Sequence, residues 1–348
     1  MKRVLLKIPK VKSNPEGYVR RCPYCKGNIL VRWGKRERTL KDPDIKGVGV
    51  QRWKCLSCNR TFTQRPKGVS RKLSSDFVVA LTITLYAFGL SYSSISIALS
   101  FFEVFIDPST AWRYIQECGQ RLSKRNKKGR YSIAGFDQTY MKVKGKKRTV
   151  NMVFSREGIL LDVAILPDET SETFREKIKK LKEELGIEVL VTDDHNSYER
   201  GFIDTGVDRQ LCVIHVLRNI IKALKGVNLS EEEKALIFKL ARSPTKEGGK
   251  ILWEMYLKEL RGRGSKDEVT QILLRITEKW RDLTLYERRE GVPRDNNFTE
   301  RSICRTKIRY KTTRGLKSEE GLLNFVYVTQ EIWRRNALGE IDLEDLIA

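Results

Sequence analysis

The hydrophobic pattern of the chain changes from a helical period to an alternation of strands and helices near residue 130. Between residues 74 and 122 the apolar positions predict helices over 75–88 and 93–102, and a third helix that opens at Asp107-Pro108-Ser109. Gly89 ends the first helix, and Trp112, Ile115 and Leu122 have core-like spacing on the third. Three helices with a glycine at the first corner are compatible with helix-turn-helix geometry. A helical spacer or a dimerisation unit would show the same pattern.

The part after residue 130 reads as an α/β domain. The pattern predicts strands over 131–136, 148–154 and 159–166, a helix over 171–185, a strand over 187–192, a short helical stretch, a strand near 210–214 and a helix from His215. Gly186 stops the long helix, and Thr173 and Glu176 have the spacing of a capping box. Three strands in hairpins followed by helix, strand, helix, strand and helix is the element order of the RNase H-like fold.

Charge is concentrated at the front of the chain. Residues 1–130 hold 28 Lys and Arg against 8 Asp and Glu, whereas the remaining residues hold 40 against 36. A surplus confined to one third of the chain favours a module that binds a polyanion, here DNA. Basic clusters flank the helical segment on both sides: Arg65, Lys67, Arg71 and Lys72 before it, and Lys124, Arg125, Lys127, Lys128 and Arg130 after it.

No segment has the pattern of a membrane span or a signal peptide. The start MKRVLLKIPKVK is too basic, and the longest apolar stretch, 77–90, is too short to cross a bilayer. We therefore expect a cytoplasmic, nucleoid-associated protein. An odd total of seven cysteines, three of them isolated (Cys118, Cys212 and Cys304), agrees with a reducing compartment.

Four cysteines form two pairs, Cys22 with Cys25 and Cys55 with Cys58. A two-residue gap lets both thiolates of a pair face one metal, and two such pairs complete the tetrahedral shell of a structural Zn²⁺. A redox pair would be a single CxxC, and two disulfides do not suit a reducing compartment. The sequence therefore predicts a zinc ribbon, with a basic flap over 36–46 inside the long gap and a fold that depends on its metal.

Acidic residues end two of the strands that neighbour each other in this fold. Asp137 ends the first strand, and Asp193 and Asp194 follow the fourth. Carboxylates at adjacent strand ends repel each other unless a cation neutralises them, so a hard divalent metal is implied. Two-metal phosphoryl transfer needs such a site.

A third acid has to come from elsewhere, and Glu300 is the best candidate. Asp295 or Asn296 can cap a helix that runs to about Thr313, on which Glu300, Cys304, Lys307 and Lys311 share one face. A carboxylate heading a basic stripe can hold a metal while the lysines follow a phosphate backbone. A plain solvated helix explains the spacing equally well.

These motifs resemble those of DDE transposases of prokaryotic insertion sequences, near the Mutator-like group. FDQTYMKVKG at 136–145 resembles the first-aspartate block, which usually reads Asp-Glu-Thr before a short basic strand. VTDDH at 191–195 resembles the second-aspartate block, CVIHVLRN at 212–219 the Cys-x-x-His signature with its trailing Arg-Asn, and NNFTER at 296–301 the glutamate segment. Each block alone is modest, but in this order they are specific, and together they cover about residues 131–335.

The resemblance implies a catalytic triad of metal ligands for Mg²⁺ or Mn²⁺, formed by Asp137, Asp193 and Glu300. Asp194 is the alternative second acid. Gln138 departs from the usual Glu, at a position that is not a ligand in the family pattern. For Cys212 and His215, packing or positioning near the site is favoured over metal binding, and Arg218 and Asn219 complete the signature. His195 either contacts a phosphate or caps the next helix.

The resemblance also implies a helical insertion over 216–290, in which Trp253 and Trp280 either pack in the core or stack on bases. Cations that follow Glu300 would contact DNA: Arg301, Arg305, Lys307, Lys311 and Arg314. Arg309 lies on the same route to Gly315. The expected domains are a ribbon over 1–68, a helix-turn-helix-like segment over 69–130, a catalytic core over 131–215 and 291–335, the insertion, and a tail over 336–348, which packs on the core or on a second protomer.

The function expected from the resemblance is transposition: binding of the ends of a mobile element, metal-dependent DNA cleavage and strand transfer, by at least a dimer on DNA. Two other functions remain open. One is a non-catalytic DNA-binding regulator, and the other is a structure-specific nuclease on the same fold.

Overall fold

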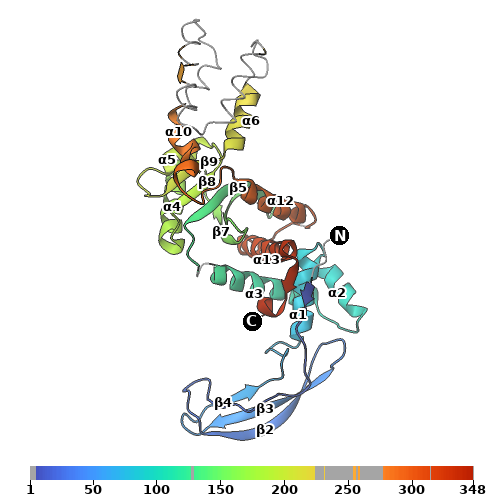
Figure 1. Cartoon of the computed structure of the whole chain (residues 1–348). Helices are drawn as coiled ribbons and strands as arrows, with labels where there is room; N and C mark the ends of the chain where they lie inside the picture. The colour runs from blue at the N-terminus through green and yellow to red at the C-terminus, as the bar shows by residue number, and fades with distance from the viewer. Residues whose placement is uncertain are drawn as a thin grey trace. The chain divides into compact units, whose positions relative to one another are not determined.

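The computed structural model describes residues 5–126, 129–223, 277–313 and 315–347, together with the single positions 231, 254, 255 and 258. The chain forms two compact units (Figure 1). We call 124–305 the sheet unit, and 1–123 with 306–348 the helix–ribbon unit. The expected core included 306–335, but these residues pack with the N-terminal part of the chain instead.

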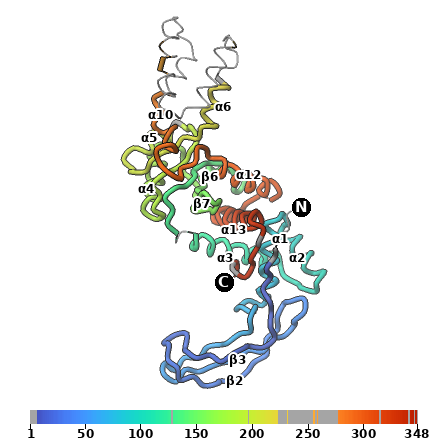
Figure 2. Tube along the Cα trace, in the orientation of Figure 1, coloured from blue at the N-terminus to red at the C-terminus, as the bar shows by residue number. Residues whose placement is uncertain are grey.

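The cysteine-bearing front end is a three-stranded antiparallel sheet. Its strands β2 (Leu30–Thr39), β3 (Gly47–Cys55) and β4 (Thr61–Gln64) lie in the order β2-β3-β4. The tube in Figure 2 shows β2 and β3 as a long hairpin. The predicted basic flap over 36–46 is therefore wrong in its first part, because residues 36–39 are paired with β3 and only 40–46 form the connection. The long gap between the cysteine pairs is a hairpin arm.

The three helices expected after residue 74 are present: α1 (Asp76–Ala87), α2 (Tyr92–Ser100) and α3 (Pro108–Asn126). Ser75 and Ser91 cap the first two through their side-chain oxygens, which accept hydrogen bonds from backbone N–H groups three residues on. Ile115 and Leu122 are buried as predicted. Trp112 is not, because 45% of it is exposed.

The C-terminal segment completes the helix–ribbon unit. Helix α13 (Glu319–Leu338) approaches α3 so closely that a Cβ on Gly119 would lie 2.5 Å from the Cβ of Asn324. Beyond α13, the strand β10 (Glu340–Asp342) pairs in parallel with β1 (Leu5–Lys7), and the helix α14 (Glu344–Ile347) follows. Arg121 donates to the carbonyl oxygens at the end of α14. The tail therefore packs on this unit.

The sheet unit has a mixed sheet of five strands. Three are antiparallel neighbours, β5 (Ile133–Val143), β6 (Lys146–Ser155) and β7 (Leu160–Leu166). The other two, β8 (Val189–Thr192) and β9 (Asp208–Leu211), extend the sheet in parallel from β5, giving the order β7-β6-β5-β8-β9. With α4 (Ser171–Leu185), α5 (Asn196–Gly201) and α6 (Val213–Ala223) between or after the strands, the predicted element order is confirmed and is consistent with an RNase H-like core.

One face of this sheet carries the core. Ala134 and Phe136 of β5 pack with Phe174, Ile178 and Leu185 of α4. Because side chains alternate across a strand, Gly135 and Asp137 lie on the other face. Gly186 ends α4 in the left-handed conformation, as predicted. The predicted capping box is wrong, because Thr170 is the N-cap and Thr173 donates its backbone N–H to it.

The remaining helices of the described chain are α10 (Trp280–Leu283), α11 (Leu285–Arg288) and α12 (Asn297–Lys311). Helix α12 begins in the sheet unit, and its residues from Thr306 on belong to the helix–ribbon unit. The strand expected near 210–214 ends at Leu211, and α6 starts at Val213. Most of the expected insertion, with Trp253, lies outside the described residues. Within the described ranges, no helix has the length and apolar character to cross a bilayer.

Candidate active site beside the central strands

Asp137 lies within β5 and Asp193 directly follows β8, the parallel neighbour of β5. The expectation that Asp137 ends its strand is wrong, because β5 continues to Val143 in its hairpin with β6. β5 and β8 pair with Gly135 opposite Val191. Asp137 and Asp193 each lie two residues beyond this last pair, so the pairing of β5 with β8 leads both chains toward the same part of the unit. The predicted neighbourhood of the first two acids therefore follows from the strand pairing.

Burial controls the charge on Asp193. Desolvation raises the pKa of Asp193, and the nearby positive groups, with His215 foremost, offset only part of this effect. Among the described residues its buried Oδ1 has no hydrogen-bond partner. Burial raises the pKa of Tyr198, and the negative charges of Asp193 and Asp137 raise it further. Both carboxylates therefore act electrostatically on the Tyr198 hydroxyl. An incompletely satisfied carboxylate beside a second one is a fitting position for a divalent cation.

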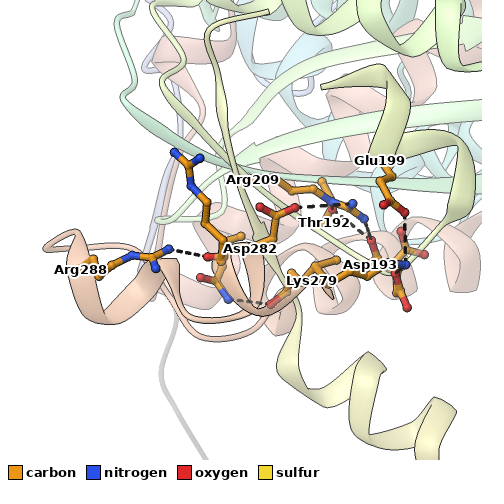
Figure 3. A network of polar contacts seen from close by, with 11 residues as sticks. Thr192, Asp193, Glu199, Arg209, Lys279, Asp282 and Arg288 are labelled. Atoms are coloured by element: carbon orange, nitrogen blue, oxygen red, sulfur yellow. Dashed lines mark hydrogen bonds and ion pairs between the residues drawn. The ribbon is translucent and has the colours of Figure 1, made fainter. Parts of the chain in front are cut away.

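Asp194, the alternative second acid, is already paired. Its Oδ1 accepts a hydrogen bond of 2.8 Å from Lys279 Nζ, which also lies 3.4 Å from Glu199 Oε2 (Figure 3). The two neighbouring aspartates thus differ in chemistry: one carboxylate is neutralised by a lysine and the other keeps a buried oxygen available.

Arg209 on β9 holds the segment that carries Asp193, a role that the sequence did not reveal. Only 4% of Arg209 is exposed, and its guanidinium donates to Thr192 Oγ1 at 3.0 Å and to the Asp193 backbone oxygen at 2.9 Å. Asp282 lies 4.0 Å from it (Figure 3). Arg209 thus binds the side chain of Thr192 and the backbone oxygen of Asp193, so it orients Asp193 and leaves the Asp193 carboxylate unoccupied.

Helix α12 begins directly against β5. A Cβ on Gly135 would collide with Thr299 Oγ1 and come within 2.6 Å of Asn296 Oδ1, so only glycine allows this approach. Asn296 Nδ2 donates to the Phe136 carbonyl oxygen at 3.2 Å, and the Asn296 backbone N–H donates to Cys212 Sγ at 3.3 Å. Asn296 occupies the N-cap position of α12, since its backbone oxygen accepts from Glu300 N at 3.1 Å, but its side chain anchors the helix to β5. Asp295 Oδ1 accepts from Asn297 N.

This anchoring brings Glu300 to the signature residues of α6. Glu300 Oε1 lies 3.5 Å from His215 Nδ1, and Glu300 Oε2 lies 3.7 Å from Arg218 Nη1. Cys212 is fully buried, with a pKa raised by desolvation, and its sulfur belongs to the same cluster. Asn219, the last signature residue, is exposed on α6.

Two clusters of the described residues have three or more ligand atoms within 4.8 Å of one another, and can thus hold a metal ion. They are the four ribbon cysteines, and Cys212 with His215 and Glu300. Asp137 and Asp193 belong to neither cluster. Of the three predicted acids, Glu300 thus lies with Cys212, His215 and Arg218, whereas Asp137 and Asp193 lie outside that cluster.

The predicted DNA-contacting cations of α12 differ in exposure. Arg301, Lys307 and Lys311 are exposed, Arg305 is half-buried, and Arg314 lies outside the described residues. Arg309, which lies among them on α12, is only 4% exposed. It donates to the carbonyl oxygens of Tyr86 and Leu90, which explains its burial. Cys304 is exposed.

Near the acidic site, His195 lies 3.9 Å from Glu169 through its Nε2 and forms no side-chain capping bond to α5. Gln138 donates to the Tyr198 hydroxyl at 2.6 Å. Trp280 lies at the start of α10. These placements give His195 and Gln138 partners at the edge of the site.

The ribbon cysteines meet the geometry of a zinc site. The sulfurs of Cys22 and Cys58 are 3.7 Å apart, and those of Cys25 and Cys55 are 3.6 Å apart. Zinc–sulfur bonds of 2.3 Å in a tetrahedron put neighbouring sulfurs about 3.8 Å apart. Burial opposes ionisation of Cys55, but hydrogen bonds, with that from the Cys58 backbone foremost, lower the pKa of Cys55 to about 6. This four-cysteine cluster can hold zinc.

Comparison with known proteins adds little to these observations. No protein-family model matches the chain, and no curated protein matches it. Among solved structures, the catalytic core domain of BIV integrase in crystal form I is similar, with 13% sequence identity and a TM-score of 0.20. The match covers 51% of this chain and 97% of that one. With so low a TM-score, the fold assignment rests on the sheet topology described above.

Proposed function

We propose that the protein is a DDE-type transposase, which binds the ends of a mobile DNA element and catalyses metal-dependent cleavage and strand transfer. The observation that carries the proposal is that Asp137 and Asp193 each lie two residues beyond the last pair of β5 with β8, Gly135 with Val191. Helix α12, which carries Glu300, is anchored against β5. The motif order of the sequence supports the same reading. Binding alone would not require a buried carboxylate with an oxygen that lacks a partner.

Asp137, Asp193 and Glu300 would hold divalent cations, Mg²⁺ or Mn²⁺. The donor set fits, because all three ligands are carboxylates, which hard cations prefer. The orphaned Oδ1 of Asp193 supports the assignment further. When bound, such ions supply an activated attacking oxygen and a stabilised leaving oxygen. In the chain itself, Arg209 orients Asp193, and His215 with Arg218 holds Glu300.

The proposed reaction has two balanced steps. In the first, water attacks the phosphodiester at the element's end, the bond from phosphorus to the 3′-oxygen breaks, and a 3′-hydroxyl and a 5′-phosphate result. In the second, that 3′-hydroxyl attacks a phosphodiester of the target DNA in line, forming one phosphorus–oxygen bond as another breaks. The attacking water, and then the attacking 3′-hydroxyl, loses a proton to solvent, and each leaving 3′-oxygen takes one up from solvent. The number of phosphodiester bonds is conserved in the second step.

The helix–ribbon unit would bind the element's ends. Many of its cations lie on exposed ribbon positions, including Lys35 and Arg36 on β2. Exposed Trp33 lies on the same hairpin, with Lys54 Nζ 4.6 Å from its ring centroid. Such a basic surface with an aromatic suits a phosphate backbone. Pairing two element ends would require at least a dimer on DNA.

The test uses purified protein and a supercoiled plasmid that carries the DNA flanking the gene. Reactions with Mg²⁺ or Mn²⁺ are compared with reactions in EDTA, for wild type and for Asp137→Asn, Asp193→Asn and Asp194→Asn. We expect metal-dependent cuts and joined products that Asp137→Asn and Asp193→Asn abolish. Asp194→Asn is the matched control and keeps activity, since Asp194 is paired with Lys279.

The outcomes separate the three functions. Cuts without joined products would identify a nuclease. Specific DNA binding without cuts in any metal would identify a regulator and overturn the catalytic assignment.

A further inference from the structure

A cavity of about 470 Å³ lies within the helix–ribbon unit. Its volume falls in the range of small-ligand sites. Helices α1, α2 and α3, the end of α12 and the start of α13 line it. The residues that give it its chemistry are Tyr92, Trp112, Gln116, Lys317 and the hydroxyl-bearing Ser91, Ser93, Thr312, Thr313 and Ser318. None of the described lining residues is acidic.

The aromatic side of the cavity is rigid. Tyr92 stacks on Tyr86, with ring centroids 4.9 Å apart and an interplanar angle of 8°. The Arg309 guanidinium lies 4.8 Å from the Tyr86 ring centroid and donates to Thr312 Oγ1 at 2.6 Å. This buried arginine therefore joins the aromatic pair to the segment after α12. Trp112, 45% exposed, adds a second large aromatic face that the unit leaves uncovered.

A polar group is held in place beside this aromatic surface. Gln116 lies one helical turn after Trp112 on α3, and its Oε1 accepts a hydrogen bond of 2.8 Å from Asn324 Nδ2. Asn324 lies where α13 contacts Gly119, so its position is fixed by close helix packing. With its oxygen engaged, Gln116 presents amide N–H donors. A planar ligand with ring nitrogens or carbonyl oxygens at its edge would be matched by this arrangement.

We propose that the cavity binds one extrahelical nucleotide of a DNA duplex. The base would stack on Trp112 or Tyr92, Gln116 would donate to the base edge, and Lys317 with the hydroxyl groups would contact the phosphate. Base–aromatic stacking is nearly independent of sequence, whereas the amide donors favour one base edge. The absence of acidic groups among the described lining residues agrees with an anionic ligand. The inference rests on the proposed function only in taking DNA as the partner.

The test measures how much tighter the full-length protein binds a 30-base-pair duplex with one bulged 2-aminopurine than the same duplex fully paired. Binding is followed in EDTA by fluorescence anisotropy, and the bulged base by 2-aminopurine emission. We expect roughly tenfold preference for the bulged duplex and quenching of the emission on binding. Trp112→Ala lowers the preference to about one, and Trp112→Phe restores most of it.

The matched control is Phe105→Ala, which removes another exposed aromatic of the same unit that does not line the cavity. It keeps the preference. Equal binding of both duplexes by wild type, or equal loss in both alanine variants, would overturn the inference. The inference would also be overturned if free dAMP competed for the protein more strongly than the bulged duplex does, because the cavity would then be a mononucleotide site. Failure to bind either duplex would count against the proposed function itself, because no cleavage is measured in this assay.

Discussion

The two candidate metal sites are built in opposite ways. The ribbon places four cysteines in one short segment, and their buried surroundings are only Leu30 and Trp53 besides the cysteines Cys22 and Cys55. The acidic site takes its residues from distant parts of the chain, and a large cluster of buried side chains between sheet and α4 supports it. In the ribbon, bound zinc would supply much of the free energy of folding. In the sheet unit, the packed core would fold first and then position the carboxylates that bind a metal.

The largest effect should come from removing zinc. A structural zinc contributes about 10 kcal/mol or more of binding free energy to small domains, which the few buried side chains of the ribbon cannot replace. Chelation, or Cys55→Ser, is expected to unfold β2–β4 and to leave β5–β9 folded. Hydrogen exchange read by mass spectrometry would show protection lost in residues 30–64 alone.

The control for this prediction is Cys304→Ser, which removes an exposed cysteine outside the cluster and should change nothing. If the amides of β2 and β3 stayed protected in the metal-free protein, the contrast between the two regions would be wrong.

The next effect concerns the anchor of α12. Asn296→Ala removes the donor to the Phe136 carbonyl and should let Glu300 shift relative to Asp137. Loss of a group that orients metal ligands typically costs 10- to 100-fold in activity, and we expect that range for DNA cleavage. The free energy of unfolding should fall by only about 1–3 kcal/mol. Asn297→Ala, one residue on, is the matched control, and a similar loss there would remove the special role of Asn296.

A smaller effect is expected where β5 and α12 touch. Gly135→Ala introduces a methyl group that collides with Thr299, and overpacking of this kind costs about 1–3 kcal/mol. The free energy of unfolding, measured by urea titration, should fall by that amount. Gly47→Ala in the ribbon is the control, because no atom lies within 4 Å of the added methyl. An unchanged stability of Gly135→Ala would show that α12 can retreat without cost.

The same contrast explains what could be predicted from the sequence. Spacing alone identified the ribbon cysteines, because their geometry is local. The element order of the sheet unit followed from hydrophobic periodicity, and the neighbourhood of Asp137 and Asp193 followed from that order. Arg209 and Asn296 carry no such signal, because they act through contacts between segments distant in the sequence.

Exposure was predicted less well, for the same reason. Trp112 has core-like spacing on α3 but borders a cavity, and Arg309 has the spacing of a surface cation but packs on Tyr86. In both cases the exposure of the side chain depends on how the end of α12 and the start of α13 pack with α1–α3. The local hydrophobic pattern of each segment does not encode that packing. The difference at the N-terminus of α4 has a local cause. Asp168 Oδ1 accepts hydrogen bonds from the hydroxyls of both Thr170 and Thr173, and this fixes the turn in which Thr170 is the N-cap.

The smallest effect tests whether the acidic site is strained without metal. Burial raises the pKa of Asp193, so the folded state binds this proton more tightly than the unfolded state does. Wild type in EDTA should therefore lose stability as the pH rises from about 3.9, the ordinary value for Asp, through the higher pKa of the folded state. Above that pKa the cost is constant, and below the unfolded-state pKa it is absent.

Asp193→Asn removes this titration, so in EDTA at pH 7 it should be more stable than wild type. Mg²⁺ should reverse the order, because a ligand stabilises the form that binds it. Thermal unfolding over pH 3–8, with and without Mg²⁺, measures both effects. Asp194→Asn should behave oppositely in EDTA and lose stability, because it leaves Lys279 with one acidic partner fewer. If both variants were destabilised alike without metal, Asp193 would be an ordinary structural carboxylate, and the acidic site would resemble the ribbon in needing all its side chains to fold.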